Sequence, residues 1–359
     1  MSHTAYFYLT PEGQALAEKL AASHPGDLYG KENFKQQLQA AFTRYDSLVC
    51  IMATGIVVRI LAPLIVHKTS DPAVVVLDQK GQHAISLLSG HLGGANDLAR
   101  EMAFLSGGEA VITTATDVAG QISFDSFAKK YGMAIENISQ LKYISGSLLE
   151  GRSIRVITDL HYSAESYPEL YRGEQEGHLL IMTARDYKEE SHQGPSSEES
   201  ASAGLTGEHL PTVVIDEGLT LPVSDPAPIL YLRPRTICAG IGCKRNMDAA
   251  SIEAALLETL KKEGLSPLSL KCISTIPLKA EEAGILTTCD HLHVPLVVIP
   301  TEEIQRLDIR ELGIASSDFV AQQTGVLSVS TASSYLASDK REILVDKEKY
   351  KGITIALSR

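Results

Sequence analysis

Apolar and polar positions in the first 90 residues follow the periods of strands and helices in turn. Residues 4–9 alternate, and residues 47–53 form a short continuous apolar run, as buried strands do. A helical period follows each of these segments, and Pro63 is expected to kink or end the second helix. Apolar runs at 73–77 and 83–88 flank a polar turn and predict a hairpin.

A glycine-rich segment then leads into another helix and strand. Residues 90–94 open a predicted helix over 95–105, and a strand over 109–114 follows. Strand, glycine-rich loop, helix and strand in this order are typical of a βαβ unit. We therefore predict an α/β domain in the amino-terminal part of the chain.

The pattern of apolar and polar positions changes after about residue 140 and again near residue 229. A few strands are predicted in between, at 153–158 and 179–183, with a Ser-, Glu- and Gly-rich insert over 186–209 that is expected to be mobile or disordered. A second α/β unit follows, with helices predicted at 248–263 and 280–291 and strands at 236–241, 269–273, 294–299, 326–329, 342–345 and 352–357. The predicted fold is α/β and multi-domain, with an N-terminal α/β domain over 1–140, a small middle domain over 141–228 and a C-terminal α/β domain over 229–359.

Composition narrows the classes of ligand. The 359 residues include 32 Lys and Arg against 44 Asp and Glu, a formal net charge of −12. This balance argues against general nucleic-acid or anionic-membrane binding, which depends on cationic surface. It leaves room for a small anionic ligand, because such a ligand needs only local donors.

No membrane span and no signal peptide are expected, because no uncharged apolar stretch of 18 residues or cationic leader is visible. The five scattered cysteines, without a CxxC pair, are typical of reduced thiols in a cytoplasmic protein.

The loop before the helix at 95–105 carries the first candidate site. Glycines allow close backbone approach, and a helix N-terminus offers unpaired N–H groups to an anion. The same glycines also suit a tight turn without a ligand, and neither GxGxxG nor a Walker A motif is present. His91 is either a proton-transfer residue or a histidine that packs the turn. The candidates of this loop are Ser89, Gly90, His91, Gly93, Gly94 and Asn96.

Two other segments of this domain carry candidates. Thr54 and Gly55 begin a predicted helix, and Arg59 either clamps a carboxylate or lies on the surface. Thr113, Thr114 and Asp117 follow a predicted strand and either face a common crevice or cap the next element.

The C-terminal unit offers a similar set. A second glycine turn, which includes Cys243, is expected to receive an anion, although a small buried thiol is the simpler role for that cysteine. Lys279 and Glu282 are either an acid–base pair or a helix ion pair. The run from Cys289 to His293 has metal-like spacing but no second cluster, so no metal site is predicted. The candidates of the turn are Gly240, Gly242, Cys243, Lys244 and Arg245.

Long runs of this sequence resemble a known family. Residues 55–117, with GIVVRILAPLIVHKTSDPAVVVLDQKG, ISLLSGHLGGANDLA and VITTATD, resemble the amino-terminal region of the cobalt-precorrin-5A hydrolase family of anaerobic cobalamin biosynthesis. The run that contains GIGCKRN and LKAEE looks like the carboxyl-terminal domain of the same family, which also occurs alone in the aerobic pathway. Together the two regions cover roughly half of the chain in the order of the family.

The resemblance implies a reaction. The family opens the δ-lactone of a cobalt-containing, ring-contracted corrinoid and expels a bridge carbon with its methyl group as acetaldehyde. The resemblance implies no cofactor, because cobalt arrives inside the substrate. On chemical grounds we expect His91 to act as acid or base with Thr114 and Asp117 orienting it, and the amides of residues 90–96 to stabilise an oxyanion. Lys279 and Glu282 would bind substrate or assist protonation.

The sequence departs from the family at two points. Asn246 stands where the family has a glycine, and asparagine is tolerated in a left-handed turn. Residues 329–334 lack the carboxylate that family members often have in this segment. Two other interpretations stay open at this stage, a corrinoid carrier without catalysis and a nucleotide-binding oxidoreductase. Substrate is expected between the first and last domains, and contacts with neighbouring pathway enzymes or a homodimer are left open.

Overall fold

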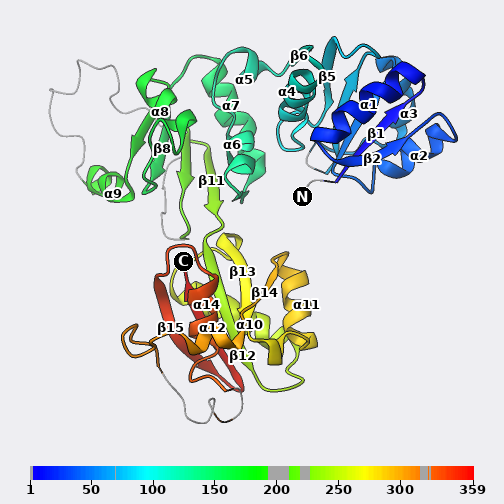
Figure 1. Cartoon of the computed structure of the whole chain (residues 1–359). Coiled ribbons are helices and arrows are strands. Elements are labelled where there is room, and N and C mark those ends of the chain that lie inside the picture. Colours follow the sequence, from blue (N-terminus) through cyan, green and yellow to red (C-terminus); the bar gives the residue numbers. More distant parts are fainter. Residues whose placement is uncertain (1–2, 69, 193–209, 219–226, 316–321, 323–324) are drawn as a thin grey trace, which may run out of the picture. The chain divides into compact units, whose positions relative to one another are not determined.

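The computed structural model describes residues 3–68, 70–192, 210–218, 227–315, 322 and 325–359 (Figure 1). The chain divides into two compact units, which are described separately. Unit 1 comprises Met1–Lys130, Ser145–Arg152 and Tyr162–His178, and unit 2 comprises Tyr131–Ile144, Ser153–His161 and Leu179–Arg359. Strands and helices alternate through both units, so the predicted α/β class is confirmed.

Unit 1 contains a six-stranded sheet with the order β2-β1-β3-β4-β5-β6. Every neighbouring pair is parallel except β4 and β5, which form the predicted hairpin. Because the hairpin reverses the chain, Leu88 at the end of β5 pairs with Val74 near the start of β4. The strands are β1 (Thr4–Tyr8), β2 (Gly26–Tyr29), β3 (Ser47–Ile51), β4 (Ala73–Leu77), β5 (His83–Leu88) and β6 (Glu109–Val111).

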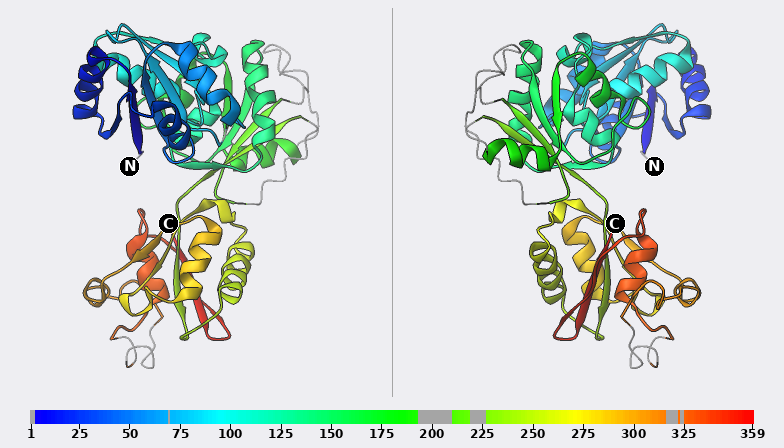
Figure 2. Two further views of the ribbon diagram at one scale, coloured as in Figure 1. Left: turned by 90° about the vertical axis from the view of Figure 1, so that its right-hand side faces the viewer. Right: turned by 90° about the vertical axis from the view of Figure 1, so that its left-hand side faces the viewer.

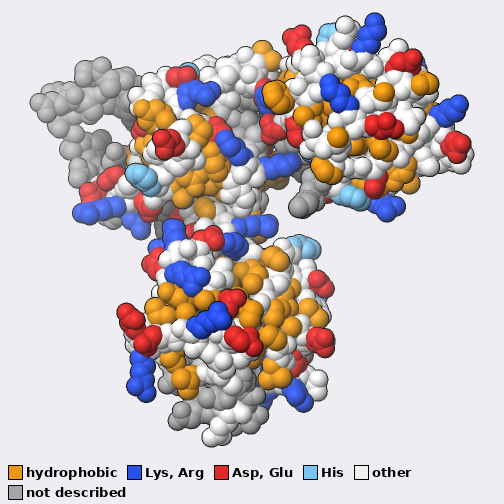
Figure 3. All heavy atoms as spheres, in the orientation of Figure 1, with side chains coloured by type: hydrophobic (Ala, Val, Ile, Leu, Met, Phe, Trp, Pro, Cys, Tyr) orange, Lys and Arg blue, Asp and Glu red, His pale blue; other side chains and the backbone are white. Residues whose placement is uncertain are grey.

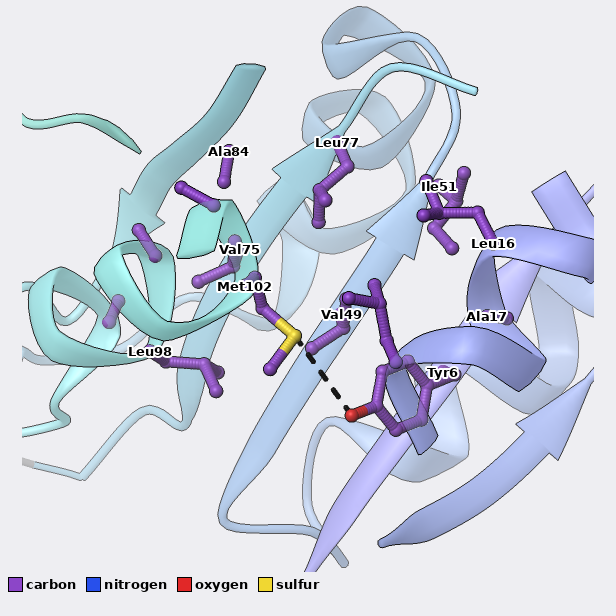
Figure 4. Close-up of a cluster of buried hydrophobic side chains, with 14 of the residues drawn as sticks. Tyr6, Leu16, Ala17, Val49, Ile51, Val75, Leu77, Ala84, Leu98 and Met102 are labelled. Carbon is purple, nitrogen blue, oxygen red and sulfur yellow. Dashed lines mark hydrogen bonds between the residues drawn. The ribbon is translucent and has the colours of Figure 1, made fainter. Parts of the chain in front are cut away.

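Helices cover both faces of this sheet, because successive strand residues point to opposite sides. On one face Tyr6, Val49 and Val75 pack with α1 (Pro11–Ser23) and α4 (Ala95–Ser106). Figure 4 shows this core, where the Tyr6 hydroxyl lies 3.9 Å from Met102 Sδ. The other face packs Phe7, Cys50 and Val76 with α2 (Phe34–Ala41) and α3 (Thr54–Leu61).

The remaining helices of unit 1 are short. The α3 helix ends at Leu61 and passes into η1 (Ala62–Leu64), so Pro63 lies in a tight turn beyond the helix, as predicted. After β6, α5 (Ala115–Val118) and α6 (Phe124–Lys130) follow, and α8 (Pro168–Gln175) belongs to the same unit. Buried Phe124 and Phe127 anchor α6, and the Phe127 ring packs 6.0 Å from that of Tyr167.

The middle sheet of the chain belongs to unit 2 and has the order β7-β11-β10-β8-β9. Of its strands, the sequence analysis missed β7, β10 and β11, because they are short and lack a flanking pattern. Residues 186–192, the start of the insert expected to be mobile or disordered, lie in α9 (Ala184–His192), and 193–209 lie outside the described residues. The domain boundaries at 140 and 228 stay predictions. The elements are β7 (Met133–Ile135), η2 (Ile138–Gln140), β8 (Ile154–Thr158), β9 (Leu179–Met182), β10 (Thr212–Ile215) and β11 (Ile229–Pro234). The helix α7 (Leu141–Leu149) belongs to unit 2 up to Ile144 and to unit 1 from Ser145.

The third sheet, also in unit 2, has the order β14-β13-β12-β16-β15. The first three strands are parallel, and β16 is antiparallel to β12 and β15. Figure 2 shows helices on both of its sides, with α10 and α11 on one side and α14 on the other. The elements are β12 (Ile237–Cys243), α10 (Ala249–Lys262), η4 (Pro267–Ser269), β13 (Leu270–Thr275), η5 (Pro277–Lys279), α11 (Ala283–Leu292), β14 (Leu296–Val298), α12 (Thr301–Gln305), α14 (Ser330–Ala337), β15 (Ile343–Tyr350) and β16 (Ile353–Ser358).

The strand predicted at 326–329 does not form. Val326 and Val329 are buried in an apolar cluster with Ile276 and Ile299, immediately before α14 begins. Their apolar character therefore reflects packing of a connection, which resembles a buried strand in a short window.

Candidate functional site

The glycine-rich loop after β5 lies at the edge of the first sheet where β3 and β4 begin. The β4–β5 hairpin causes this, because Leu88 pairs with Val74 whereas Leu77, the last residue of β4, pairs with Ala84. The helix α3, which begins at Thr54, follows the opposite end of β3. The two predicted anion-binding loops of this domain are therefore separated by the length of the sheet.

The glycines of the loop are needed for contacts within the loop itself. A Cβ on Gly93 would lie 2.2 Å from Ser89 Cβ, and one on Gly90 would lie 2.8 Å from Asn96 Oδ1. Gly94 has a φ of +91°, which other residues rarely adopt. The amides of Ala95 and Asn96 donate to the carbonyls of Ser89 and Gly90 at 3.1 and 3.0 Å, so these two amides are already used.

His91 lies between two carboxylates. Its Nε2 is 2.8 Å from Asp117 Oδ2, and its Nδ1 is 3.3 Å from Asp125 Oδ2. Thr116 Oγ1 lies 3.3 Å from Nε2 as well. The side chains of His91 and Asp117 keep 20% and 17% of their surface exposed, and that of Asp125 keeps 5%. The imidazole is thus held on both nitrogens and still reaches solvent.

Asp117 is the centre of a wider hydrogen-bond network. Thr114 Oγ1 and Asn96 Nδ2 donate to its Oδ2 at 2.7 and 3.0 Å, and Arg100 Nη2 donates to its Oδ1 at 2.5 Å. Ser86 Oγ donates to Asn96 Oδ1 at 2.7 Å, which orients that amide. The predicted grouping of His91, Thr114 and Asp117 in one place is what the structure shows.

The charges of this network favour a protonated imidazole. The hydrogen bond to Asp125 makes the largest contribution and raises the pKa of His91, burial opposes it, and Asp117 adds to the increase. Burial alone would raise the pKa of each aspartate, but hydrogen bonds outweigh burial and lower both pKa values. The hydrogen bonds to Asp117 come from Thr114, Arg100 and His91. Those to Asp125 come from His91 and Ser123. The two carboxylates therefore favour the imidazolium form of His91 over the neutral ring.

The sequence analysis missed Asp125, which lies on α6. The next turn of this short helix carries Lys129, whose Nζ donates to the Gly93 carbonyl at 2.6 Å. Side chains at i and i+4 share a helix face, so α6 contacts the loop at two points. The apolar residues Phe124, Phe127 and Ala128 are the sequence signal for α6, and that signal identifies no partner for Asp125.

Two pockets of unit 1 adjoin the loop. The Arg100 pocket has a volume of about 460 Å³, is next to Asp117 and is lined by residues that include Asp97, Arg100, Lys130, Glu169, Arg172 and Glu176. The Arg44 pocket has a volume of about 710 Å³, is next to Gly93 and is lined by residues that include Phe42, Arg44, Asp71, Val66, Leu92 and Lys129. Both volumes are of the size that small-molecule sites have.

Other predicted residues of this domain lie elsewhere. Arg59 donates to the carbonyl of Gly55 at 3.1 Å, and Thr54 lines a third pocket of about 560 Å³ at the opposite edge of the sheet. Ser89 Oγ donates to the Asp71 carbonyl at 2.9 Å, and Thr113 is exposed next to Thr114.

In the C-terminal unit the predicted glycine turn is part of a strand. Gly240 and Gly242 lie inside β12, where a Cβ would come 1.8 Å from the Ser330 carbonyl and 2.6 Å from Thr354 Oγ1. Cys243 ends the strand, and burial raises the pKa of its thiol, which makes it a poor nucleophile. The glycines thus allow α14 and β16 to approach β12. Lys244 and Arg245 are exposed in the connection to α10.

Lys279 and Glu282 form an ion pair at 2.7 Å, with 12% and 13% of their side-chain surface exposed. Glu282 Oε2 also accepts the Asn246 amide at 3.0 Å, and Asn246 has a φ of +57°, as expected from its replacement of glycine. The N-terminus of α10 is capped by Asp248, which accepts the Ser251 amide at 2.8 Å. The carboxylates of Glu282 and Asp248 therefore accept the backbone amides that were predicted to bind an anion from solution.

Within the residues that the structure describes, no group of three His, Cys, Asp or Glu side chains is arranged to hold a metal ion. Cys289 is buried, and His291 pairs with Glu253 at 3.0 Å. None of the described helices is long and apolar enough to cross a bilayer. On the face in Figure 3, Lys and Arg side chains are interspersed with Asp and Glu.

Comparison with known proteins gives three matching family profiles. They are described as Cobalamin synthesis G N-terminal, over residues 36–117, Cobalamin biosynthesis central region, over 122–234, and Cobalamin synthesis G C-terminus, over 237–358. The solved structure of CobE, a protein from the cobalamin (vitamin B12) biosynthetic pathway, matches 34% of this chain and 89% of its own at 26% identity, with a TM-score of 0.32.

Curated proteins named Cobalt-precorrin-5A hydrolase match nearly the whole chain. The protein from Salmonella typhimurium is 32% identical over 98% of this chain and 96% of its own. The protein from Priestia megaterium is also 32% identical, over 89% of this chain and 80% of its own. The chain therefore belongs to the cobalt-precorrin-5A hydrolase family and is a hydrolase with a role in cobalamin biosynthesis.

Proposed function

We propose that this enzyme opens the δ-lactone of cobalt-precorrin-5A and releases acetaldehyde to give cobalt-precorrin-5B, with His91 as the proton-transfer residue. The names of the relatives support the substrate, and one observation supports the residue. His91 is bonded on both ring nitrogens by carboxylates, which favour its cationic form. An imidazolium near solvent is a suitable acid for an acyl-transfer reaction.

In the first step, water adds to the lactone carbonyl carbon and loses a proton to solvent. The acyl–oxygen bond then breaks, and the leaving alkoxide oxygen takes a proton from His91. The carboxylic acid that forms loses a second proton to solvent, so the products are a carboxylate and a carbinol, and His91 is neutral. Asp117 and Asp125 hold the ring in place while its charge changes.

In the second step, neutral His91 takes the carbinol O–H proton. The carbonyl group of acetaldehyde forms as the carbon–carbon bond to the macrocycle breaks, and the electron pair of that bond stays with the macrocycle. His91 is then an imidazolium again, so one residue serves both proton transfers. We propose that no cofactor is bound, because cobalt enters within the substrate, and that the enzyme works in the cytoplasm. We also propose that the enzyme forms a homodimer or contacts neighbouring enzymes of the pathway.

The test is to incubate the protein with cobalt-precorrin-5A and trap the aldehyde that it releases. We expect one acetaldehyde per corrinoid, and a loss of at least about 100-fold in rate for His91→Ala, which is the lower range for a removed acid–base group. His83→Ala is the matched control, because His83 is exposed and lies at the start of β5, away from the loop. Its rate should stay within twofold of the wild type, by the usual scale for surface changes of roughly 0.5 kcal/mol.

Two results would contradict this proposal. Corrinoid binding without acetaldehyde would support the carrier interpretation. Normal turnover of His91→Ala would place the chemistry at another residue, with the Lys279–Glu282 pair as the next candidate.

A further inference from the structure

The two pockets beside the loop differ in the charge that they offer to a ligand. The Arg100 pocket is lined by the carboxylates of Asp97, Asp117, Glu169 and Glu176 against the cations Arg100, Lys130 and Arg172. Arg100 is already bonded to Asp97 and Asp117, and Lys130 to Glu169. The carboxylates of this lining outnumber its cations by one, and two of the three cations are already paired, so the lining is less favourable for a ligand with several carboxylates.

The two carboxylates of the Arg44 pocket, Asp46 and Asp71, accept hydrogen bonds from backbone amides. Asp71 is buried and accepts the Val66 amide at 3.0 and 3.2 Å, and Asp46 accepts the His3 amide at 2.9 Å. Hydrogen bonds from the backbone disperse the charge of a carboxylate. The pocket therefore presents less negative potential than its two aspartates suggest.

Among the described residues no ion pair joins Arg44 or Lys129 to a carboxylate, although the charges of Asp97 and Asp46 act on Lys129 from a greater distance. Arg44 lies over the Tyr45 ring at 5.6 Å, and Lys129 Nζ donates to the Gly93 carbonyl. Burial lowers the pKa of Lys129, so a bound anion would stabilise its charge. Guanidinium and ammonium groups that are in no ion pair are the usual ligands of carboxylates.

The same pocket has an apolar side. Phe42, Leu64, Val66 and Leu92 line it, and the side chain of Val66 is 82% exposed. An apolar residue at this exposure is stabilised when a ligand covers it. Cations beside exposed apolar groups suit a ligand with carboxylates around an apolar ring.

We infer that the Arg44 pocket binds one edge of a carboxylate-bearing macrocycle, with Arg44 and Lys129 contacting its acidic side chains. The inference rests on the proposed function, because it takes the substrate class from there. Leu92 and Gly93 line the pocket and His91 precedes them, so a macrocycle edge in this pocket lies against the loop that carries the proposed acid.

The test compares the same substitution in the two pockets. A cobalt corrinoid with free acetate and propionate groups, and the same corrinoid with these groups amidated, are titrated into the full chain and binding is followed by absorbance. Arg44→Ala should weaken binding of the carboxylated corrinoid about tenfold, the loss of one charged hydrogen bond, and leave the amidated one unchanged. Arg172→Ala should change neither, since Arg172 lies in the Arg100 pocket.

Weaker binding for Arg172→Ala with normal binding for Arg44→Ala would overturn the inference, and so would equal effects on both corrinoids. Aldehyde release separates these results from the proposed function. Wild-type turnover with an unaffected KM in Arg44→Ala would contradict the pocket and leave the reaction standing. Selective loss of carboxylate binding in Arg44→Ala, with no aldehyde from the wild type, would support the pocket and contradict the reaction.

Discussion

The loop after β5 and the segment over residues 240–243 show the same local sequence pattern, an apolar run followed by glycines and a helix, and the structure uses them differently. In unit 1 the glycines build a loop beyond the strand, which places His91 between Asp117 and Asp125. In unit 2 Gly240 and Gly242 stay within β12, because α14 and β16 pack against them. Glycine spacing alone therefore does not distinguish a ligand loop from a close contact between elements.

The largest expected difference between the two regions comes from removing one carboxylate from each of them. Asp117→Asn should lower kcat about 1,000-fold, because it removes one of the two charges that favour protonated His91 and the carboxylate that orients its Nε2. Glu282→Gln should lower kcat less than about tenfold, as the loss of a peripheral contact does. Aldehyde release under saturating substrate measures both. Equal losses would show that both regions take part in the chemistry.

The glycines themselves give the next largest effect. Gly240→Ala should reduce the free energy of unfolding by about 3 kcal/mol, because the new Cβ meets a backbone carbonyl that cannot move freely. Gly94→Ala should cost about 1 kcal/mol, since its Cβ meets the flexible end of Lys129 and the strain comes from φ. Urea unfolding of the full chain, with hydrogen exchange of the β12 amides to assign the transition, measures these values. A smaller cost for Gly240 than for Gly94 would refute the packing explanation.

The charge state of His91 predicts a pH effect that the C-terminal pair lacks. Activity that depends on the imidazolium should fall as pH rises through the pKa of His91, which lies above its ordinary value. Asp125→Asn removes the largest cause of that increase, so the fall should move to lower pH. A pH–rate profile of both proteins measures this, with Asp248→Asn in α10 as the control. An unmoved profile would contradict the role of Asp125.

The pKa shifts of His91 and its two aspartates also determine how the free energy of unfolding changes with pH. A raised pKa in the folded state stabilises the fold below the unfolded pKa, and this contribution is lost as pH rises through the folded value. The lowered pKa values of Asp117 and Asp125 act in the opposite sense and are lost as pH falls through their folded values. Unfolding of unit 1 should therefore become easier toward both alkaline and acidic pH. Replacing His91 with Ala should remove the alkaline part and reduce the acidic part, because His91 is one of the groups that lower the pKa values of both aspartates.

The ion pair of unit 2 gives the smallest effect. A double-mutant cycle of Lys279→Met and Glu282→Gln should show a coupling of about 1 kcal/mol in unfolding, because the pair is largely buried but lies three residues apart on one turn. A coupling near zero would mean that Glu282 acts mainly as the acceptor of the Asn246 amide.

Local patterns determined much of this molecule. The runs around the 78–81 turn led to the hairpin, and the loop at 90–94 led to α4 and β6. His91, Thr114 and Asp117 were grouped correctly because all three lie at strand ends within 30 residues of each other, where a βαβ unit brings its connections together.

Only the tertiary structure decided which other groups meet at His91 and which edge of the sheet carries the site. Asp125 and Lys129 reach the loop from α6, and helix packing sets that contact with no local sequence signal. The antiparallel β4–β5 pair sends the loop to the edge opposite Thr54, and the packing of α14 sets the surroundings of Gly240. Periodicity encodes the elements, because it depends on neighbours in the chain, whereas contacts between elements depend on how the whole sheet is assembled.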